Sequence, residues 1–138
     1  MTNNILPEVW GPHGWKFMHY VALGYPDIPT DHDKTAYKAF FESLQGVLPC
    51  QSCARHYREN LQKVPIGDHL RDREALMRWT IDLHNEVNLV TNKPVLSYEE
   101  AFELYTQKQF PLLSLLSKAF ILILILIGVY VLLRRKNL

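Results

Sequence analysis

The chain has 138 residues, of which 48% are apolar and 12% aromatic, so it is not intrinsically disordered. Its two cysteines exclude a disulfide-dense secreted scaffold and a four-cysteine zinc site. Residues 1–111 carry 11 Lys/Arg against 14 Asp/Glu, a net charge of −3, whereas residues 112–138 carry four basic residues and no acidic one. Because no basic face dominates the first part, nucleic-acid binding is not expected.

The predicted elements are helices, taken here in chain order. Apolar and aromatic residues recur at helical spacing over about residues 14–23, 31–47, 50–62, 71–91 and 98–109. Thr30 or Asp31 is suited to cap the second segment, and Ser97 with Glu100 forms a capping box before the fifth. No strand-like alternation persists between these segments. The sequence therefore predicts an all-α bundle.

A long apolar run begins near Pro111. Residues 112–133 contain a single charge, Lys118, and three basic residues follow them. A helix of this length spans roughly 33 Å at about 1.5 Å per residue, against about 30 Å for the hydrocarbon core of a bilayer. We therefore expect one domain over residues 1–110 and a transmembrane helix with a basic tail over residues 111–138.

The two ends of the chain bear on its topology. The N-terminal segment lacks the basic residues and the apolar stretch of a secretory signal peptide. An anchor at the tail without a signal peptide leaves the folded domain in the cytosol, whereas the positive-inside rule favours the cytosolic side for the basic residues 134–136. Because so short a tail is easily translocated, we expect the domain to be cytosolic.

Cys50 and Cys53 have the spacing of a dithiol/disulfide site. Pro49 suits the start of a helix, and a helix N-terminus favours the thiolate form of Cys50. The second cysteine then lies one turn further on, close enough to bond to the first. Helical surroundings argue against a thioredoxin-like βαβ domain. A structural zinc site that adds His56 and His84 stays an alternative, although the spacing matches no common zinc finger.

The segment Trp10–His19 is the first of two further groups of interest. Trp15 and His19 are four residues apart and share a helix face. Gly11 allows the backbone to approach a ligand closely. The same pattern also fits an amphipathic helix with an aromatic core face and a buried, hydrogen-bonded histidine.

The segment Trp79–Asn88 is the second group. On a helix, His84 and Asn88 lie on one face and Asn85 flanks them, so three groups that donate and accept hydrogen bonds project beside an apolar stripe. This arrangement suits a flat heteroaromatic ring or a nucleotide between helices. An exposed polar face is the alternative interpretation.

Together, these segments resemble the Erv/ALR family of FAD-linked sulfhydryl oxidases. Three blocks stand in family order: W-G-x-x-x-W-x-x-x-H at residues 10–19, C-x-x-C at 50–53 and H-N-x-V-N at 84–88, followed by Lys93 and a proline. The match covers about residues 8–109. The resemblance implies a four-helix bundle with a short fifth helix, which holds FAD at its mouth and forms a homodimer.

The resemblance also implies the site residues, with Cys50 and Cys53 as the catalytic pair and no metal. Its cofactor-binding residues come from the first and fourth helices, the turn that follows and the fifth helix: Gly11, Trp15, His19, Trp79, His84, Asn85, Asn88, Lys93 and Tyr105. The aromatic rings would pack on the flavin and adenine, the imidazole and amide groups would hydrogen-bond to FAD, and the lysine would meet its phosphate or ribose region.

The mechanism implied by the resemblance starts with a substrate thiolate that attacks the disulfide, at the more exposed Cys50, and a second thiolate that resolves the mixed disulfide. Cys53, the flavin-proximal cysteine, would pass two electrons to FAD, and O2 would then be reduced to H2O2. The chain lacks a second, shuttle CxxC, so the partner is a protein dithiol substrate or a thioredoxin-like carrier. Family positions of a structural disulfide align with Gln62 and Tyr98, so that staple is missing.

Minimal membrane-anchored forms of this kind resemble those of large cytoplasmic DNA viruses. This resemblance predicts a host or virion membrane, with the oxidase domain on the cytosolic side. Two alternatives stay open at this point. One is a tail-anchored interaction module with a structural zinc site, and the other is a scaffold that binds flavin without turnover.

Overall fold

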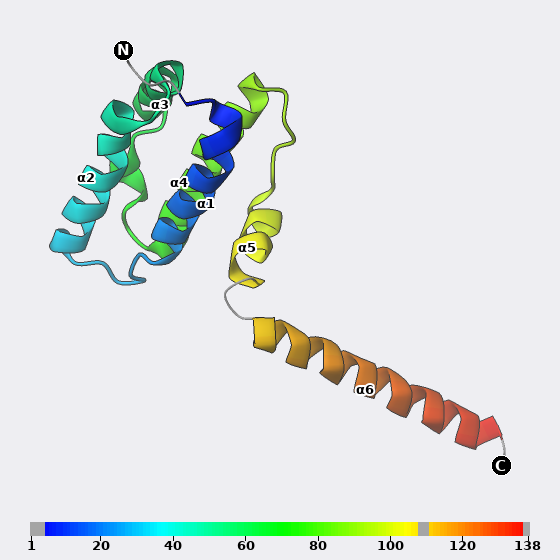
Figure 1. Cartoon of the computed structure of the whole chain (residues 1–138). Helices are drawn as coiled ribbons and strands as arrows, with labels where there is room; N and C mark the ends of the chain where they lie inside the picture. Colours follow the sequence, from blue (N-terminus) through cyan, green and yellow to red (C-terminus); the bar gives the residue numbers. More distant parts are fainter. Residues whose placement is uncertain (1–4, 108–110, 137–138) are drawn as a thin grey trace. The chain divides into compact units, whose positions relative to one another are not determined.

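The computed structural model describes residues 5–107 and 111–136, with the side chains of residues 5–106 and 115–128. Helices make up every regular element of these described residues (Figure 1). They are α1 (Pro7–Leu23), α2 (Asp31–Val47), α3 (Gln51–Lys63), the short 3₁₀ helix η1 (Ile66–His69), α4 (Arg73–Val90), α5 (Tyr98–Gln107) and α6 (Pro111–Lys136). The predicted all-α class is confirmed.

The chain forms two compact units, Met1–Ala101 and Phe102–Leu138. In the first unit, α1 packs along α4 and α2 packs along α3, while η1 contacts α2 and α4 (Figure 1). The predicted domain boundary after residue 110 adjoins residues 108–110, which lie outside the described residues. That boundary therefore stays a prediction.

Large apolar side chains from several helices form the core of the first unit. Trp79 is fully buried, its ring meets Phe41 edge-on with 5.1 Å between centroids, and its indole Nε1–H donates to the carbonyl of Val64 at 2.9 Å. Burying each side chain of this size contributes about 1.5–3 kcal/mol. The other large, fully buried side chains are Tyr25, Phe41, Ile66, Leu76, Met77, Ile81 and Leu83.

The first helix begins earlier than predicted, at Pro7 instead of Gly14. Proline is favoured in the first turn of a helix, because it has no N–H to leave unpaired there. Gly14 lies within the helix, and a Cβ at this position would be 3.0 Å from the Trp10 ring. The first block of aromatic and glycine residues is thus helical, and its second glycine makes room for a neighbouring side chain.

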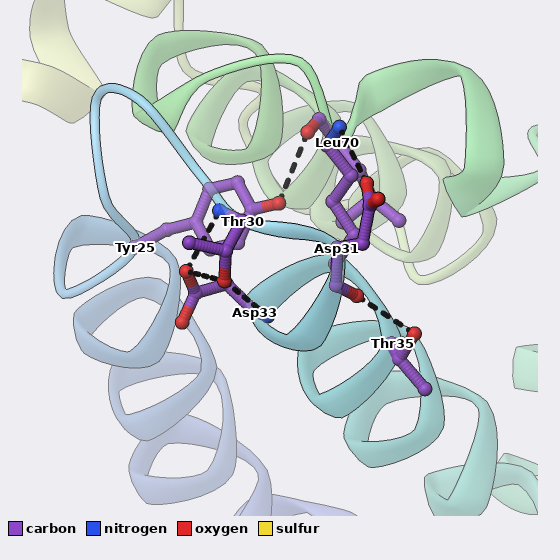
Figure 2. Close-up of polar contacts among 7 residues, drawn as sticks. Tyr25, Thr30, Asp31, Asp33, Thr35 and Leu70 are labelled. Carbon is purple, nitrogen blue, oxygen red and sulfur yellow. Dashed lines mark hydrogen bonds and ion pairs between the residues drawn. The ribbon is translucent and has the colours of Figure 1, made fainter.

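The start of the second helix agrees with the prediction. Thr30 caps α2: its hydroxyl accepts from the backbone N–H of Asp33 at 3.2 Å, and the Asp33 carboxylate accepts from the Thr30 backbone N–H at 2.8 Å (Figure 2). The hydrogen bonds to Thr30 hold the pKa of Asp33 below its usual value. Before this cap, the Tyr25 hydroxyl donates to the carbonyl of Leu70 at 3.0 Å, which ties the loop after α1 to the segment before α4.

The end of α4 is a Schellman motif built on an asparagine. Asn92 has φ of 53°, a left-handed conformation that asparagine tolerates better than most residues. Its N–H donates to Leu89 at 3.3 Å, and the N–H of Lys93 donates to the carbonyl of Asn88 at 2.8 Å. This geometry fixes the backbone of Lys93 against the last turn of α4.

The first turn of α5 is held on α4 by side chains. The Tyr98 hydroxyl donates to the Asp82 carboxylate at 2.7 Å, and the Arg78 guanidinium lies 4.4 Å from the centre of the Tyr98 ring. The predicted capping box is confirmed, because Ser97 and Glu100 exchange hydrogen bonds of 2.8 and 3.2 Å. A hydrogen bond and a cation–π contact thus hold Tyr98 without a covalent link.

The second unit contains α6, whose apolar side chains at residues 115, 116 and 120–127 are each more than half exposed. Over the part of the chain that the structure describes, no helix combines the length and the apolar character that crossing a membrane requires. The ends of the predicted span, residues 112–114 and 129–133, lie outside the described side chains.

Candidate active site

The redox pair lies at the start of α3. Cys50 is the N-cap residue, and its sulfur is bonded to that of Cys53, with 5.2 Å between the two Cα atoms. The Cys50 sulfur also accepts from the backbone N–H of Cys53 at 3.2 Å and lies 3.2 Å from the Ser52 hydroxyl. Because both sulfurs are used in this bond, neither is available as a thiolate ligand for zinc.

The exposure of the two cysteines differs from the prediction. Cys50 is only 2% exposed, whereas Cys53 is half-buried. The expectation that Cys50 is the more exposed cysteine is therefore wrong for this structure. The chain before α1 lies beside the pair, since the backbone N–H of Ile5 donates to the carbonyl of Pro49 at 2.9 Å.

A histidine pair joins α1 and α4. His19 Nε2 and His84 Nδ1 are 3.1 Å apart, and His19 Nδ1 is 3.0 Å from the hydroxyl of Thr80. Trp15 stacks on the His84 ring with 4.2 Å between centroids and 8° between planes. The stacking with Trp15 and the hydrogen bond with His19 thus fix the orientation of the His84 ring. In both contacts, α1 supplies one side chain and α4 supplies the other.

Burial keeps both histidines neutral. Desolvation, and then the neighbouring His84, lower the pKa of His19 to about 3. Desolvation, and then the charge of Lys93, lower the pKa of His84 to about 4. At neutral pH the pair therefore acts through hydrogen bonds and carries no positive charge.

Two predicted ligand-binding groups lie near this pair and are available. Asn88 is only 7% exposed, and its side-chain amide has no hydrogen-bond partner among the residues that the structure describes. The ammonium of Lys93 is exposed and close enough to influence His84 electrostatically. A Cβ at Gly11 would meet no atom within 4 Å, so the backbone there faces open space.

Three predicted site residues have other roles in the structure. Trp79 has no exposed surface and is part of the core, so a direct contact with a cofactor is not supported. His19 is 1% exposed, and its Nε2 lies 3.1 Å from Nδ1 of His84. The Asn85 amide is held by the backbone of Leu96, donating to its carbonyl at 2.8 Å and accepting from its N–H at 3.1 Å.

Two residues remain, one that the sequence predicted and one that it did not. Tyr105 belongs to the unit Phe102–Leu138, so its role in the site stays a prediction. Thr80 was not predicted, although it precedes His84 by four residues and so shares its helix face. That spacing is the signal that identifies it in the sequence.

Comparison with known proteins decides the family. Residues 12–111 match the sequence model of the Erv1/Alr family, which is more than half of the chain. The chain belongs to the Erv1/Alr family.

Relatives in this family include viral and yeast proteins. The mimivirus protein named "Probable FAD-linked sulfhydryl oxidase R368", from Acanthamoeba polyphaga mimivirus, is 52% identical over 98 residues, which cover 70% of this chain and 68% of the relative. The FAD-linked sulfhydryl oxidase of African swine fever virus is 32% identical over 104 residues, which cover 71% of this chain and 81% of the relative. The crystal structure of the FAD binding domain of Erv1 from Saccharomyces cerevisiae superposes with a TM-score of 0.69 at 28% identity, covering 74% of this chain and 95% of the yeast chain.

Proposed function

We propose that this member of the Erv1/Alr family is an FAD-dependent sulfhydryl oxidase that forms disulfides in protein thiols. The observation that carries the proposal is the Cys50–Cys53 disulfide at the N-terminus of α3, in a chain whose relatives are named FAD-linked sulfhydryl oxidases. Its substrates are protein dithiols or a dithiol carrier, and O2 is the final electron acceptor.

The residues around His84 fit a flavin nucleotide. The stacked rings of Trp15 and His84 offer an aromatic surface, and the Asn88 amide is a nearly buried polar group without a protein partner among the described residues. An amide in that position favours a bound group that donates or accepts hydrogen bonds. The Lys93 ammonium supplies the charge that a phosphate requires. When bound, FAD supplies the capacity to take up two electrons and release them to O2 as H2O2.

The thiol chemistry is carried out by the cysteine pair. A substrate thiolate attacks the Cys50–Cys53 disulfide, a mixed disulfide forms, and one enzyme sulfur leaves as a thiolate. A second substrate thiolate then attacks the mixed disulfide, which yields oxidised substrate and a fully reduced pair. Cys50 is the N-cap of α3 and its sulfur accepts from the backbone N–H of Cys53, so the helix N-terminus stabilises negative charge on that sulfur.

The cofactor assignment predicts a specific loss on Lys93→Met. Removing a charged hydrogen-bond donor to a phosphate costs about 1.5–3 kcal/mol, so we expect FAD to bind about ten- to a hundredfold more weakly. Lys34→Met is the matched control, because Lys34 is also accessible to solvent but pairs with Asp31 on α2. Flavin titration by fluorescence quenching measures both affinities. Equal affinities for the two variants would remove Lys93 from the site.

We also propose that α6 anchors the chain in a membrane through residues 112–133. Support comes from the composition of this segment and from its row of exposed apolar side chains. The full chain is expected to sediment with membranes and to resist an alkaline wash. The double variant Ile123→Arg/Ile127→Arg should weaken this attachment, since each arginine costs about 2.5–3.5 kcal/mol at a span centre. Ile28→Arg, at a 91% exposed position outside α6, is the control.

A full chain that remains in the soluble fraction contradicts the anchor without affecting the oxidase proposal. The homodimer, the cytosolic orientation of the domain, and the host or virion membrane stay predictions. They rest on the resemblance to viral oxidases and on the sequence of the tail.

A further inference from the structure

A chain of hydrogen bonds runs from the backbone of α4 to the outer face of the histidine pair. The Thr80 hydroxyl lies 2.7 Å from the carbonyl of Met77 and 3.0 Å from Nδ1 of His19. On the other side of the His19 ring, Nε2 lies 3.1 Å from Nδ1 of His84. The last atom of the chain, Nε2 of His84, has no hydrogen-bond partner among the described residues.

The hydrogen bond from Thr80 to the carbonyl of Met77 determines which atom is the donor in each of the two bonds that follow. A carbonyl oxygen only accepts, so a separation of 2.7 Å from the Thr80 hydroxyl requires the hydroxyl proton to lie on this line. The Thr80 oxygen is therefore an acceptor toward His19, and Nδ1 of His19 carries the proton of that bond. In a neutral imidazole the other nitrogen is then bare, so Nε2 of His19 accepts from Nδ1–H of His84.

Both rings are neutral, as this assignment requires, because burial lowers the pKa of His19 to about 3 and that of His84 to about 4. The second ring is also held in place, since Trp15 stacks on it within 8° of parallel. His84 is half-buried, and its Nε2 is not among the fully buried polar atoms without a partner, so this nitrogen has access to solvent.

We propose that Thr80 is a positioning residue that, through His19, fixes His84 in the tautomer with its proton on Nδ1 and presents a bare Nε2 as a hydrogen-bond acceptor to the flavin nucleotide. This inference rests on the proposed function and specifies the chemistry of one contact. His84 then pairs with a hydroxyl or N–H donor of the nucleotide, such as a ribose hydroxyl. It does not pair with a phosphate, because a fully ionised phosphate offers only acceptor oxygens. Lys93 is the residue that binds the phosphate.

The first test reads the tautomer directly and needs no variant of Thr80. Nitrogen NMR of the full chain labelled with 15N-histidine, in detergent and with FAD bound, separates protonated from bare ring nitrogens. His84→Gln identifies the signals of this residue by their loss. The expected result is a protonated Nδ1 and a bare Nε2 on His84 at neutral pH. A protonated Nε2 on His84 overturns the proposal.

The second test examines whether the Thr80 hydroxyl determines the tautomer of His84. Thr80→Val keeps the shape of the side chain but removes the oxygen that accepts from His19, whereas Thr80→Ser keeps the hydroxyl. Loss of one buried hydrogen bond of ordinary strength predicts about a two- to tenfold weaker FAD affinity for Thr80→Val. We also expect its His84 spectrum to show both tautomers, and Thr80→Ser to retain the wild-type spectrum.

The outcomes separate this inference from the proposed function. A single, unchanged His84 tautomer in Thr80→Val shows that another group sets the tautomer, and the assignment of Thr80 is then wrong. If Thr80→Val fails to fold, the wild-type and Thr80→Ser spectra still decide the tautomer. A chain that binds no flavin contradicts the proposed function, while its His84 tautomer can still be measured without the cofactor.

Discussion

Cys53→Ser abolishes thiol-dependent oxygen consumption, reducing turnover to the rate of the buffer alone. The disulfide of Cys50 and Cys53 is the group that accepts electrons from the substrate, and a serine hydroxyl cannot form it. The chain contains no other cysteine that could replace the missing one. Oxygen-electrode assays with a reduced dithiol peptide measure the loss.

Ser52→Ala provides the control for this variant. Ser52 lies between the two cysteines in the first turn of α3, and the change leaves both sulfurs in place. We expect its turnover to stay within about threefold of the wild type, since it loses at most one weak hydrogen bond to sulfur. Wild-type turnover by Cys53→Ser would show that electrons enter by another route.

Stability decreases as the pH falls from about 6.5 to about 5 because of the buried histidine pair. His19 and His84 have pKa values of about 3 and about 4 in the folded chain, against about 6.5 when unfolded. Above pH 6.5 neither state binds a proton, so the histidines do not affect the unfolding equilibrium. Below it, the unfolded chain takes up protons that the folded chain does not, and the free energy of unfolding falls.

The size of this effect makes it measurable by urea unfolding in detergent. Each histidine contributes about 1.4 kcal/mol per pH unit, and screening by solvent at the half-buried His84 reduces its share, so we expect a loss of about 2–4 kcal/mol between pH 6.5 and pH 5. The lowered pKa values of Asp33, Asp72 and Glu100 act below about pH 4.5, so they do not account for a loss in this range. An unfolding free energy that stays constant from pH 6.5 to pH 5 would contradict the neutral pair.

Local sequence signals predicted the helices and the starts of α2, α3 and α5 well, whereas α1 begins at Pro7 and not at Gly14. The side chains of Thr30 and Ser97 reach only three residues along the chain, so a cap at Thr30 or Asp31 and the capping box at Ser97 could be predicted from spacing alone. The place of Cys50 at the N-terminus of α3 follows from its neighbouring proline in the same way. Each of these features depends on contacts within one turn of a helix.

Features that depend on distant contacts were less predictable. From the sequence, the apolar face that carries Trp79 could contact a cofactor or the core. The packing of Phe41 on α2 against Trp79 shows that this side chain belongs to the core. Asn85 is held by Leu96, eleven residues away, after a loop whose path the sequence does not specify. The burial of Cys50 likewise depends on tertiary structure, not on its place in the motif.

An anaerobic absorption spectrum of the purified chain tests the central claim most directly. The oxidase proposal predicts a visible flavin band that is bleached by a reduced dithiol peptide and that returns, with H2O2, when air is admitted. In Cys53→Ser the band should be present but should not respond to the peptide. A purified chain without a flavin band, or with a band that the peptide leaves unchanged, would contradict the proposed function.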